Sequence, residues 1–140
     1  MLPNQESPAS PSSIPSPDVL IVDRSHDNRE VLSTVLRRHG YQTLEADRNA
    51  DGLRLVRECH PQVLVLDAET IDAASPSACA DFNSEAATRN ASILLLGKTS
   101  ASRNAIPDAN VVAKPYHYGP LIRKIEELLV QADREFQNIL

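Results

Sequence analysis

Short apolar segments alternate along the chain with segments in which apolar residues recur every three or four positions. Continuous apolar runs are typical of parallel strands covered on both faces, and the three-and-four spacing is typical of amphipathic helices. The segments that predict strands are 18–22, 41–45, 62–66, 92–96 and 110–113. Strands that alternate with helices in this way predict right-handed βαβ units and a parallel sheet.

The segments between these strands carry recognisable helix ends. We expect one helix from Ser25 to Gly40, one that ends before Pro61, one at 72–89 that starts at Ser75–Pro76, and a last one after Gly119–Pro120. Ser25 or Asp27 can accept a hydrogen bond from a free N–H at the start of the first helix. Gly40 suits the left-handed conformation that often closes a helix.

These elements predict one fold class. Five strands joined by helices suit a doubly wound α/β domain with a parallel sheet in the flavodoxin-like order 2-1-3-4-5. Residues 98–108, between the fourth and fifth strands, show little apolar periodicity. We therefore expect the fourth helix to be shortened to one or two turns.

Three regions divide the chain. Residues 1–17 hold five of the ten prolines and five serines, a composition that predicts a disordered leader. Residues 18–131 carry the alternating pattern and predict the folded domain. Residues 132–140 are expected to form a tail or an extension of the last helix.

Composition narrows the function classes. The net charge is −5, and without a basic stripe we expect no nucleic-acid partner. The only two cysteines, Cys59 and Cys79, lie in no metal or redox motif, which favours a reducing cytoplasm. No segment reaches the length of a membrane helix, so we expect a cytoplasmic protein without a membrane partner.

Charged residues follow three of the predicted strands: Asp23 after the first, Asp67 after the third and Lys114 after the fifth. Ligands bind beyond the carboxyl ends of the strands in such sheets. Because strands one and three are neighbours in this order, Asp23 and Asp67 should converge, with Lys114 opposite. A carboxylate there can act as a nucleophile toward a phosphoryl group, and a lysine can neutralise the developing charge.

Three segments at this edge resemble the signature segments of response-regulator receiver domains. They are Val19–Asp23, Val63–Asp67 and Val112–Pro115. Each segment alone is common, but all three in this order, within a chain of this length, are fairly specific. The resemblance extends over residues 18 to about 131.

The resemblance implies a phosphorylation site. Asp67 would accept phosphate from a histidine kinase or a phosphotransfer protein, and Lys114 would contact the phosphoryl group. The bond between Lys114 and Pro115 would be cis. Mg²⁺ would be held by Asp23, Asp67 and a backbone carbonyl near Glu69, since hard cations take oxygen ligands.

The chain departs from the family pattern at three positions. Arg24 stands where the family has a second acid that helps hold the metal. Gly97 replaces a hydroxyl residue, which removes a hydrogen bond worth about 0.5–1.5 kcal/mol, although Thr99 and Ser100 follow closely. Val111 stands at the position of the family's aromatic switch and has no ring to swing.

Two functions therefore remain open. In the first, the chain is a single-domain receiver that is phosphorylated on Asp67 and acts on an unidentified protein target. In the second, it is a pseudo-receiver binding module in which Arg24 and Lys114 neutralise the acidic pocket without metal. At most we expect self-phosphorylation and dephosphorylation chemistry. A flavin or nucleotide enzyme is disfavoured because no G-x-G-x-x-G or P-loop follows a strand.

Overall fold

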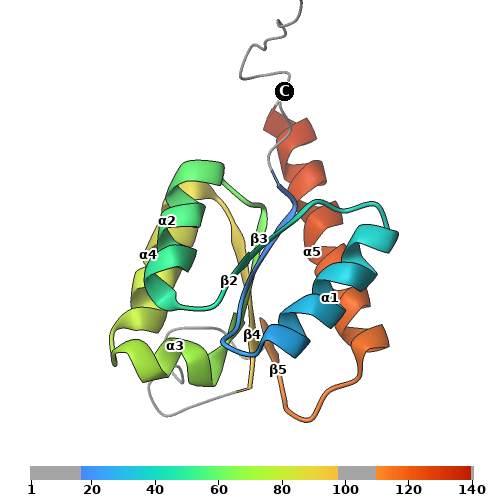
Figure 1. Ribbon diagram of the computed structural model, residues 1–140. Coiled ribbons are helices and arrows are strands. Elements are labelled where there is room, and N and C mark those ends of the chain that lie inside the picture. Colours follow the sequence, from blue (N-terminus) through green and yellow to red (C-terminus); the bar gives the residue numbers. More distant parts are fainter. Residues whose placement is uncertain (1–16, 98–109, 140) are drawn as a thin grey trace, which may run out of the picture.

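One twisted parallel sheet forms the centre of the molecule (Figure 1). The computed structural model describes residues 17–97 and 110–139. The strands are β1 (Val19–Val22), β2 (Thr43–Ala46), β3 (Val63–Asp67), β4 (Ser92–Leu96) and β5 (Val111–Val112). Their order, β2-β1-β3-β4-β5, confirms the predicted flavodoxin-like order.

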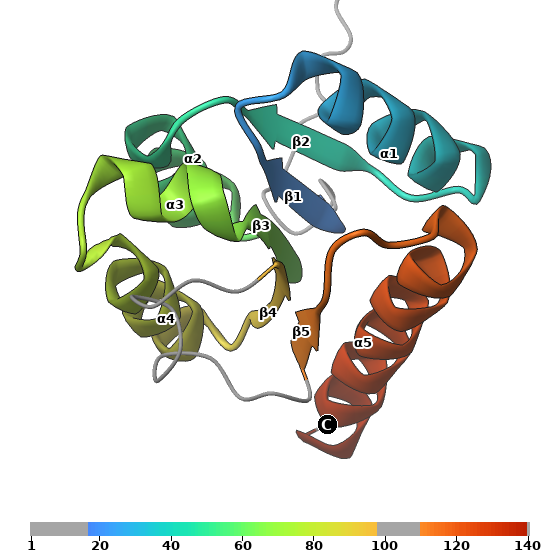
Figure 2. The same cartoon turned by 90° about the horizontal axis from the view of Figure 1, so that it is seen from below.

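Helices cover both faces of this sheet. They are α1 (His26–Arg38), α2 (Asn49–Cys59), α3 (Ala68–Ala74), α4 (Ala78–Arg89) and α5 (Tyr118–Ile139). α1 and α5 lie on one face, and α2 and α4 lie on the other, as the two views show (Figures 1 and 2). The expected short helix between the fourth and fifth strands lies outside the described residues.

β1 and β3 lie in the middle of the sheet order and are buried along their whole length. Alternate residues point to opposite faces of a strand. Each strand therefore contributes side chains to two hydrophobic cores, one on each face of the sheet. Leu20 belongs to the core under α2 and α4, and Ile21 belongs to the core under α1 and α5. Burial of such a side chain stabilises the fold by about 1.5–3 kcal/mol, which explains why these strands read as continuous apolar runs.

Gly52 allows α2 to pack closely at the end of β1. A Cβ atom at this position would lie 2.9 Å from Val22 Cγ2 and 3.0 Å from Phe82 Cζ. A larger residue would therefore push α2 away from the strand. The close packing fixes the position of Val22, the residue directly before Asp23.

The ends of α1 follow the predicted capping pattern. The Ser25 hydroxyl accepts a hydrogen bond from the N–H of Asn28 at 3.2 Å. At the other end Gly40 adopts φ +92°, and the N–H of Tyr41 donates to the carbonyl of Leu36 at 3.1 Å. This is the Schellman arrangement. The N–H of Tyr41 is bonded to the end of α1 and is not available to the sheet. β2 therefore begins at Thr43, not at residue 41 as expected.

The prediction of one helix over 72–89 is wrong. The chain forms α3 directly after β3, then breaks, and forms α4 from Ala78. Ser75 is extended, with φ −172° and ψ 156°, because a residue before proline is driven out of the helical region. Ser75–Pro76 therefore separates two helices instead of starting one.

The last strand and helix also differ in length from the expectation. β5 is limited to Val111–Val112, against the expected 110–113. α5 begins at Tyr118 and continues to Ile139, so residues 132–139 extend the helix. Within the described residues, no helix combines the length and the apolar character that crossing a membrane requires.

Candidate functional site

Asp23, Asp67 and Lys114 meet at the carboxyl edge of the sheet. The register pairs Val22 on β1 with Leu66 on β3, so the two aspartates that follow are neighbours. The Nζ atom of Lys114 forms an ion pair with Oδ1 of Asp67. The bond between Lys114 and Pro115 is cis. The structure thus brings together all three residues expected at this edge.

Both carboxylate oxygens of Asp67 are held by groups of the chain itself. Oδ1 accepts from Lys114, and Oδ2 accepts from the N–H of Thr70 at 3.0 Å and from its hydroxyl at 2.7 Å. Asp67 thereby caps the start of α3. Burial alone would raise the pKa of Asp67, but the bonds from Lys114 and Thr70 outweigh it and lower the pKa below 3.8. Asp67 is therefore an ionised, fully engaged carboxylate.

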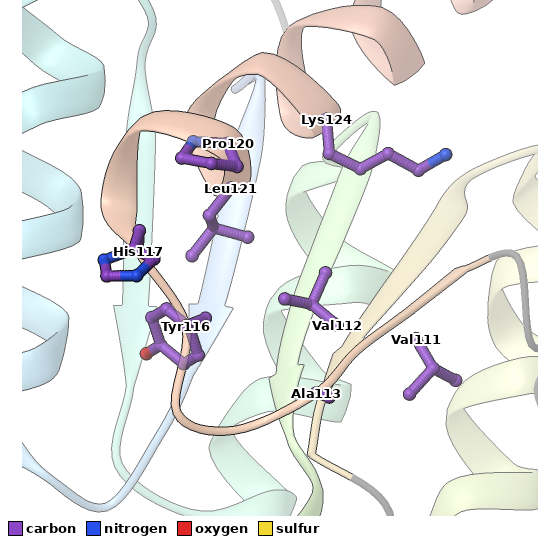
Figure 3. Close-up of a pocket in the computed structure, with 8 residues that line it drawn as sticks. All are labelled: Val111, Val112, Ala113, Tyr116, His117, Pro120, Leu121 and Lys124. Atoms are coloured by element: carbon purple, nitrogen blue, oxygen red, sulfur yellow. The ribbon is translucent and has the colours of Figure 1, made fainter.

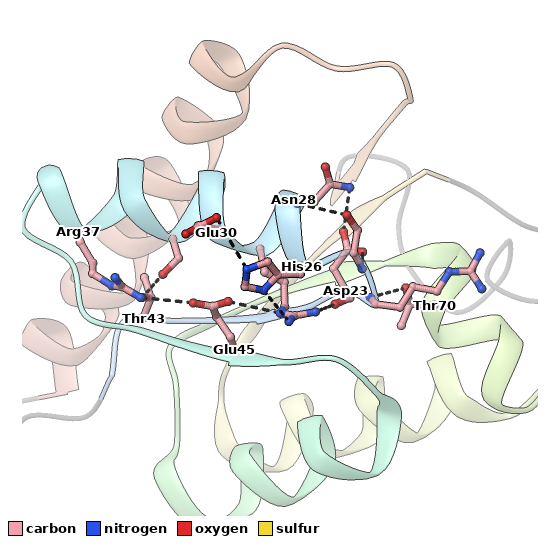
Figure 4. A network of polar contacts seen from close by, with 12 residues as sticks. Asp23, His26, Asn28, Glu30, Arg37, Thr43, Glu45 and Thr70 are labelled. Atoms are coloured by element: carbon pink, nitrogen blue, oxygen red, sulfur yellow. Dashed lines mark hydrogen bonds and ion pairs between the residues drawn. The ribbon is translucent and has the colours of Figure 1, made fainter.

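Asp23 lies beside it in a different electrostatic setting. Its Oδ1 accepts from the N–H of Ser25 at 2.9 Å, and Asn28 Nδ2 lies 3.4 Å from its Oδ2. Figure 4 shows Asp23 next to Asn28 and near Thr70. Burial raises the pKa of Asp23 above 3.8, and the charge of Asp67 acts in the same direction. Hydrogen bonds from Ser25 and Asn28 only partly offset this rise.

Arg29 fixes the backbone at the end of β1, a role that the sequence did not reveal. Its Nη1 donates to the carbonyl oxygen of Asp23 at 2.6 Å, and its Nε lies 3.3 Å from Glu45. Glu45 also pairs with Arg37 at 3.3 Å, which continues the polar network along α1 and β2 (Figure 4). The side chain of Arg29 is only 14% exposed, so this contact holds the backbone of Asp23 in place.

Arg24 does not reach the carboxylates. Its side chain is exposed, and within the described part of the chain its guanidinium forms no hydrogen bond or ion pair with Asp23 or Asp67. Its backbone N–H instead donates to the Thr70 hydroxyl at 3.0 Å. Arg24 and Lys114 were both expected to neutralise the acidic pocket. In the structure, Lys114 pairs with Asp67 and Arg24 does not reach either aspartate.

Glu69 lies in the first turn of α3. Its backbone carbonyl is part of the helix, in which carbonyl groups bond to N–H groups four residues later. Its side chain is 66% exposed and lies 3.5 Å from Lys114 Nζ. The carbonyl expected to hold a metal therefore belongs to the helical hydrogen-bond ladder.

The residues at this edge do not fit a magnesium site. Among residues 17–97 and 110–139, no group of three or more His, Cys, Asp or Glu side chains is placed to hold a metal ion. Lys114 lies on Oδ1 of Asp67 and Thr70 takes Oδ2, the second acid is replaced by an exposed arginine, and the Glu69 carbonyl lies within a helix. Lys114 supplies the positive charge that a cation would otherwise bring.

At the ends of β4 and β5, the chain lacks the hydroxyl and the aromatic ring of the family pattern, because Gly97 and Val111 stand at those positions. Gly97 adopts φ +84°, and a Cβ atom there would lie 3.4 Å from Cδ and Cε of Lys114. The lysine stem thus passes directly over the position where the family has a hydroxyl residue. Thr99 and Ser100, expected to compensate, lie outside the described residues. Val111 packs against the core under α2 and α4.

A groove of about 420 Å³ lies between β5 and α5. Val112 and Leu121 point into it, with Lys124 toward one end and Tyr116 and His117 toward the other (Figure 3). Burial raises the pKa of Tyr116, and Tyr118 and Asp23 act in the same direction. Tyr116 thus lies between the groove and the acidic edge.

The chain is similar to known proteins in sequence and in fold. No sequence-family profile matches the chain. It is 33% identical to adventurous-gliding motility protein Z of Myxococcus xanthus over 74% of the chain. It is 39% identical to protein PilH of Pseudomonas aeruginosa over 35% of the chain. The chain spans only 8% and 40% of the lengths of these two relatives.

Several solved structures share the fold of this chain. A CheY-like response-regulator receiver domain protein from Methanospirillum hungatei aligns with a TM-score of 0.72 and 21% identity, over 86% of this chain and 99% of that one. The receiver domain of a signal-transduction histidine kinase from Syntrophus aciditrophicus aligns with a TM-score of 0.72 and 22% identity, over 85% and 94%. At these identities the similarity concerns the fold.

Proposed function

We propose that this chain, which has the fold of response-regulator receiver domains, acts as a pseudo-receiver that binds a partner protein without being phosphorylated. One observation carries this proposal. Both oxygens of Asp67 are engaged by Lys114 and Thr70, so the residue at the phosphoacceptor position serves as a helix cap and an ion-pair partner.

The chemistry of phosphoryl transfer explains why this engagement matters. The attacking oxygen must approach the phosphorus in line, and it needs a lone pair that is free to do so. Oδ2 would have to release the capping contacts of α3 before it could attack. Oδ1 keeps a lone pair, but it would have to attack beside the ammonium group of Lys114. Lys114 already balances the charge of Asp67, which weakens the attraction of this pair of acids for a metal ion.

A phosphorylated receiver is the second candidate. The meeting of Asp23, Asp67 and Lys114 at one edge favours it, because the lowered pKa of Asp67 keeps this carboxyl in the nucleophilic, ionised form. In that case Asp67 would take phosphate from a histidine kinase or a phosphotransfer protein. Arg24 and Gly97 are unfavourable for phosphorylation, because each replaces a residue that the family uses at the site.

We expect the partner in both candidates to be another signalling protein. One curated relative carries the name of a gliding-motility protein, and one solved neighbour is the receiver domain of a signal-transduction histidine kinase. Cys59 and Cys79 are both free thiols, which fits a reducing compartment such as the cytoplasm.

A phosphodonor assay separates the two candidates. The full chain is incubated with acetyl phosphate and Mg²⁺, and its intact mass is measured. The pseudo-receiver predicts no species heavier by about 80 Da, the mass of a transferred phosphoryl group. A heavier species in the wild type that is absent from Asp67→Asn would overturn the proposal. Arg24→Asp serves as the companion variant, because it restores the missing acid at the metal position.

A further inference from the structure

The side chain of Thr70 joins three separate elements. Its hydroxyl donates to Oδ2 of Asp67 at 2.7 Å and accepts from the N–H of Arg24 at 3.0 Å. Thr70 itself lies in α3, Asp67 ends β3, and Arg24 belongs to the loop between β1 and α1. The residue is only 6% exposed, so water does not readily replace these bonds.

The direction of these bonds is fixed by the ionisation of Asp67. A carboxylate can only accept hydrogen bonds, so the hydroxyl proton of Thr70 must point toward Asp67. The lone pairs of the same oxygen are then left for the N–H of Arg24. A hydroxyl is required here because it donates and accepts at once. Valine has the same shape and can do neither.

We propose that Thr70 is a positioning residue. It holds the β1–α1 loop against α3 and keeps Oδ2 of Asp67 occupied. A group that takes Oδ2 of Asp67 from Thr70 frees the hydroxyl to rotate, and this weakens its contact with the N–H of Arg24. The state of the acidic site and the arrangement of the β1–α1 loop are thereby coupled. This inference rests on the proposed function, in which Asp67 remains engaged by the chain itself.

The coupling also explains why Arg24 is compatible with this site. The backbone of residue 24 is held by Thr70, while its charged side chain remains exposed. The position that carries an acid in the family therefore contributes a backbone N–H here. The loop is attached to the site through its main chain.

Amide hydrogen exchange of Arg24 tests this role of Thr70. In the wild type we expect this loop amide to be protected, and in Thr70→Val we expect its exchange to rise about tenfold, equivalent to about 1.4 kcal/mol. Thr70→Ser keeps the hydroxyl and should exchange like the wild type. The matched control is Thr88→Val, since the Thr88 hydroxyl donates to the carbonyl of Ser84 within α4 and lies outside the acidic edge.

Two results would overturn this role of Thr70. One is an Arg24 amide that is unprotected in the wild type, a measurement that does not require any variant to fold. The other is an Arg24 exchange rate in Thr70→Val equal to that of the wild type. Phosphodonor labelling of the wild type bears on the proposed function instead, so the two failures are distinguishable.

Discussion

The ends of β1 and β3 carry carboxylates that are buried to nearly the same degree but differ in charge behaviour. Asp23 is 4% exposed and Asp67 is 3% exposed. The pKa of Asp23 is raised, mainly by burial, whereas the pKa of Asp67 is lowered because its bonds from Lys114 and Thr70 outweigh burial. Burial disfavours charge in both places, and the partner decides the outcome.

The two aspartates also differ in where positive charge lies. At the end of β3, a cation of the chain lies directly on the carboxylate. At the end of β1, the carboxylate receives hydrogen bonds from neutral groups and faces the negative charge of Asp67. The positive charge is thus placed on one acid of the pair rather than shared between them.

Removal of the lysine should abolish the difference between the two acids. Lys114→Met leaves Asp67 buried and without its cation, and we expect a loss of about 2 kcal/mol in the free energy of unfolding at neutral pH. This lies below the loss of about 3–5 kcal/mol typical of a fully buried pair, because the side chain of Lys114 is 34% exposed. Denaturant unfolding measures the loss.

The control for this variant is Lys124→Met on α5, which removes a lysine that has no ion pair among the described residues. We expect it to change stability by less than about 0.5 kcal/mol. Equal losses in the two variants would show that the Lys114 ion pair contributes nothing specific.

Neutralisation of Asp67 should have a smaller effect of the same sign. In Asp67→Asn, the amide oxygen can still accept from Thr70, and Lys114 can turn toward Glu69 or water. We expect a loss of about 1 kcal/mol, the typical net value of one hydrogen bond, measured by the same unfolding experiment at neutral pH. A gain in stability would contradict the assigned pairing.

Neutralisation of Asp23 should have the opposite sign. Asp23→Asn removes the repulsion from Asp67 and keeps an oxygen that accepts from Ser25. We expect a gain of about 0.5 kcal/mol at neutral pH, in line with the modest value of single interactions of this kind. A loss of stability would indicate that Asp23 has a cationic partner that the structure does not show.

The two acids should also give opposite pH dependence. The pKa of Asp67 is lowered in the folded state, so its contribution is present above pH 3.8 and is lost as the pH falls through its folded pKa. The pKa of Asp23 is raised, so the destabilisation it causes disappears as the pH falls from its folded pKa toward 3.8. The advantage of Asp23→Asn over the wild type should therefore shrink on acidification, as unfolding at several pH values would show.

Lys114 sets the alkaline limit. Its pKa is raised above 10.5 because the bonds and charges of Asp67 and Glu69 outweigh burial, which alone would lower it. Its contribution to stability is complete below pH 10.5 and is lost as the pH rises through the folded pKa. The difference between the wild type and Lys114→Met should therefore persist over the whole neutral range.

The sequence was sufficient for the sheet and for the three charged residues at its edge. Asp23, Asp67 and Lys114 each follow a strand, and parallel topology brings strand ends together whatever lies between them. The break at Pro76 was misread because proline is also common at helix starts. Nothing in the sequence pattern indicated that a helix begins directly after Asp67.

The contacts of Thr70 and Arg29 could not be predicted for a related reason. Thr70 reaches Arg24 across 46 positions of the chain, and such a contact depends on where α3 starts. Arg29 resembles any charged residue near the start of a helix, and only the fold shows that its guanidinium binds the carbonyl of Asp23. Strand ends follow from topology, whereas these contacts follow from loop geometry.

A carboxyl-carbon NMR titration of Asp23 and Asp67, carried out with and without Mg²⁺, tests the central claim most directly. If Lys114 neutralises Asp67 in place of a metal, Asp67 will titrate below 3.8 and Asp23 above it, and added Mg²⁺ will leave both signals unchanged. A Mg²⁺-dependent shift of the Asp67 signal, or a pKa of Asp67 above that of Asp23, would contradict the account.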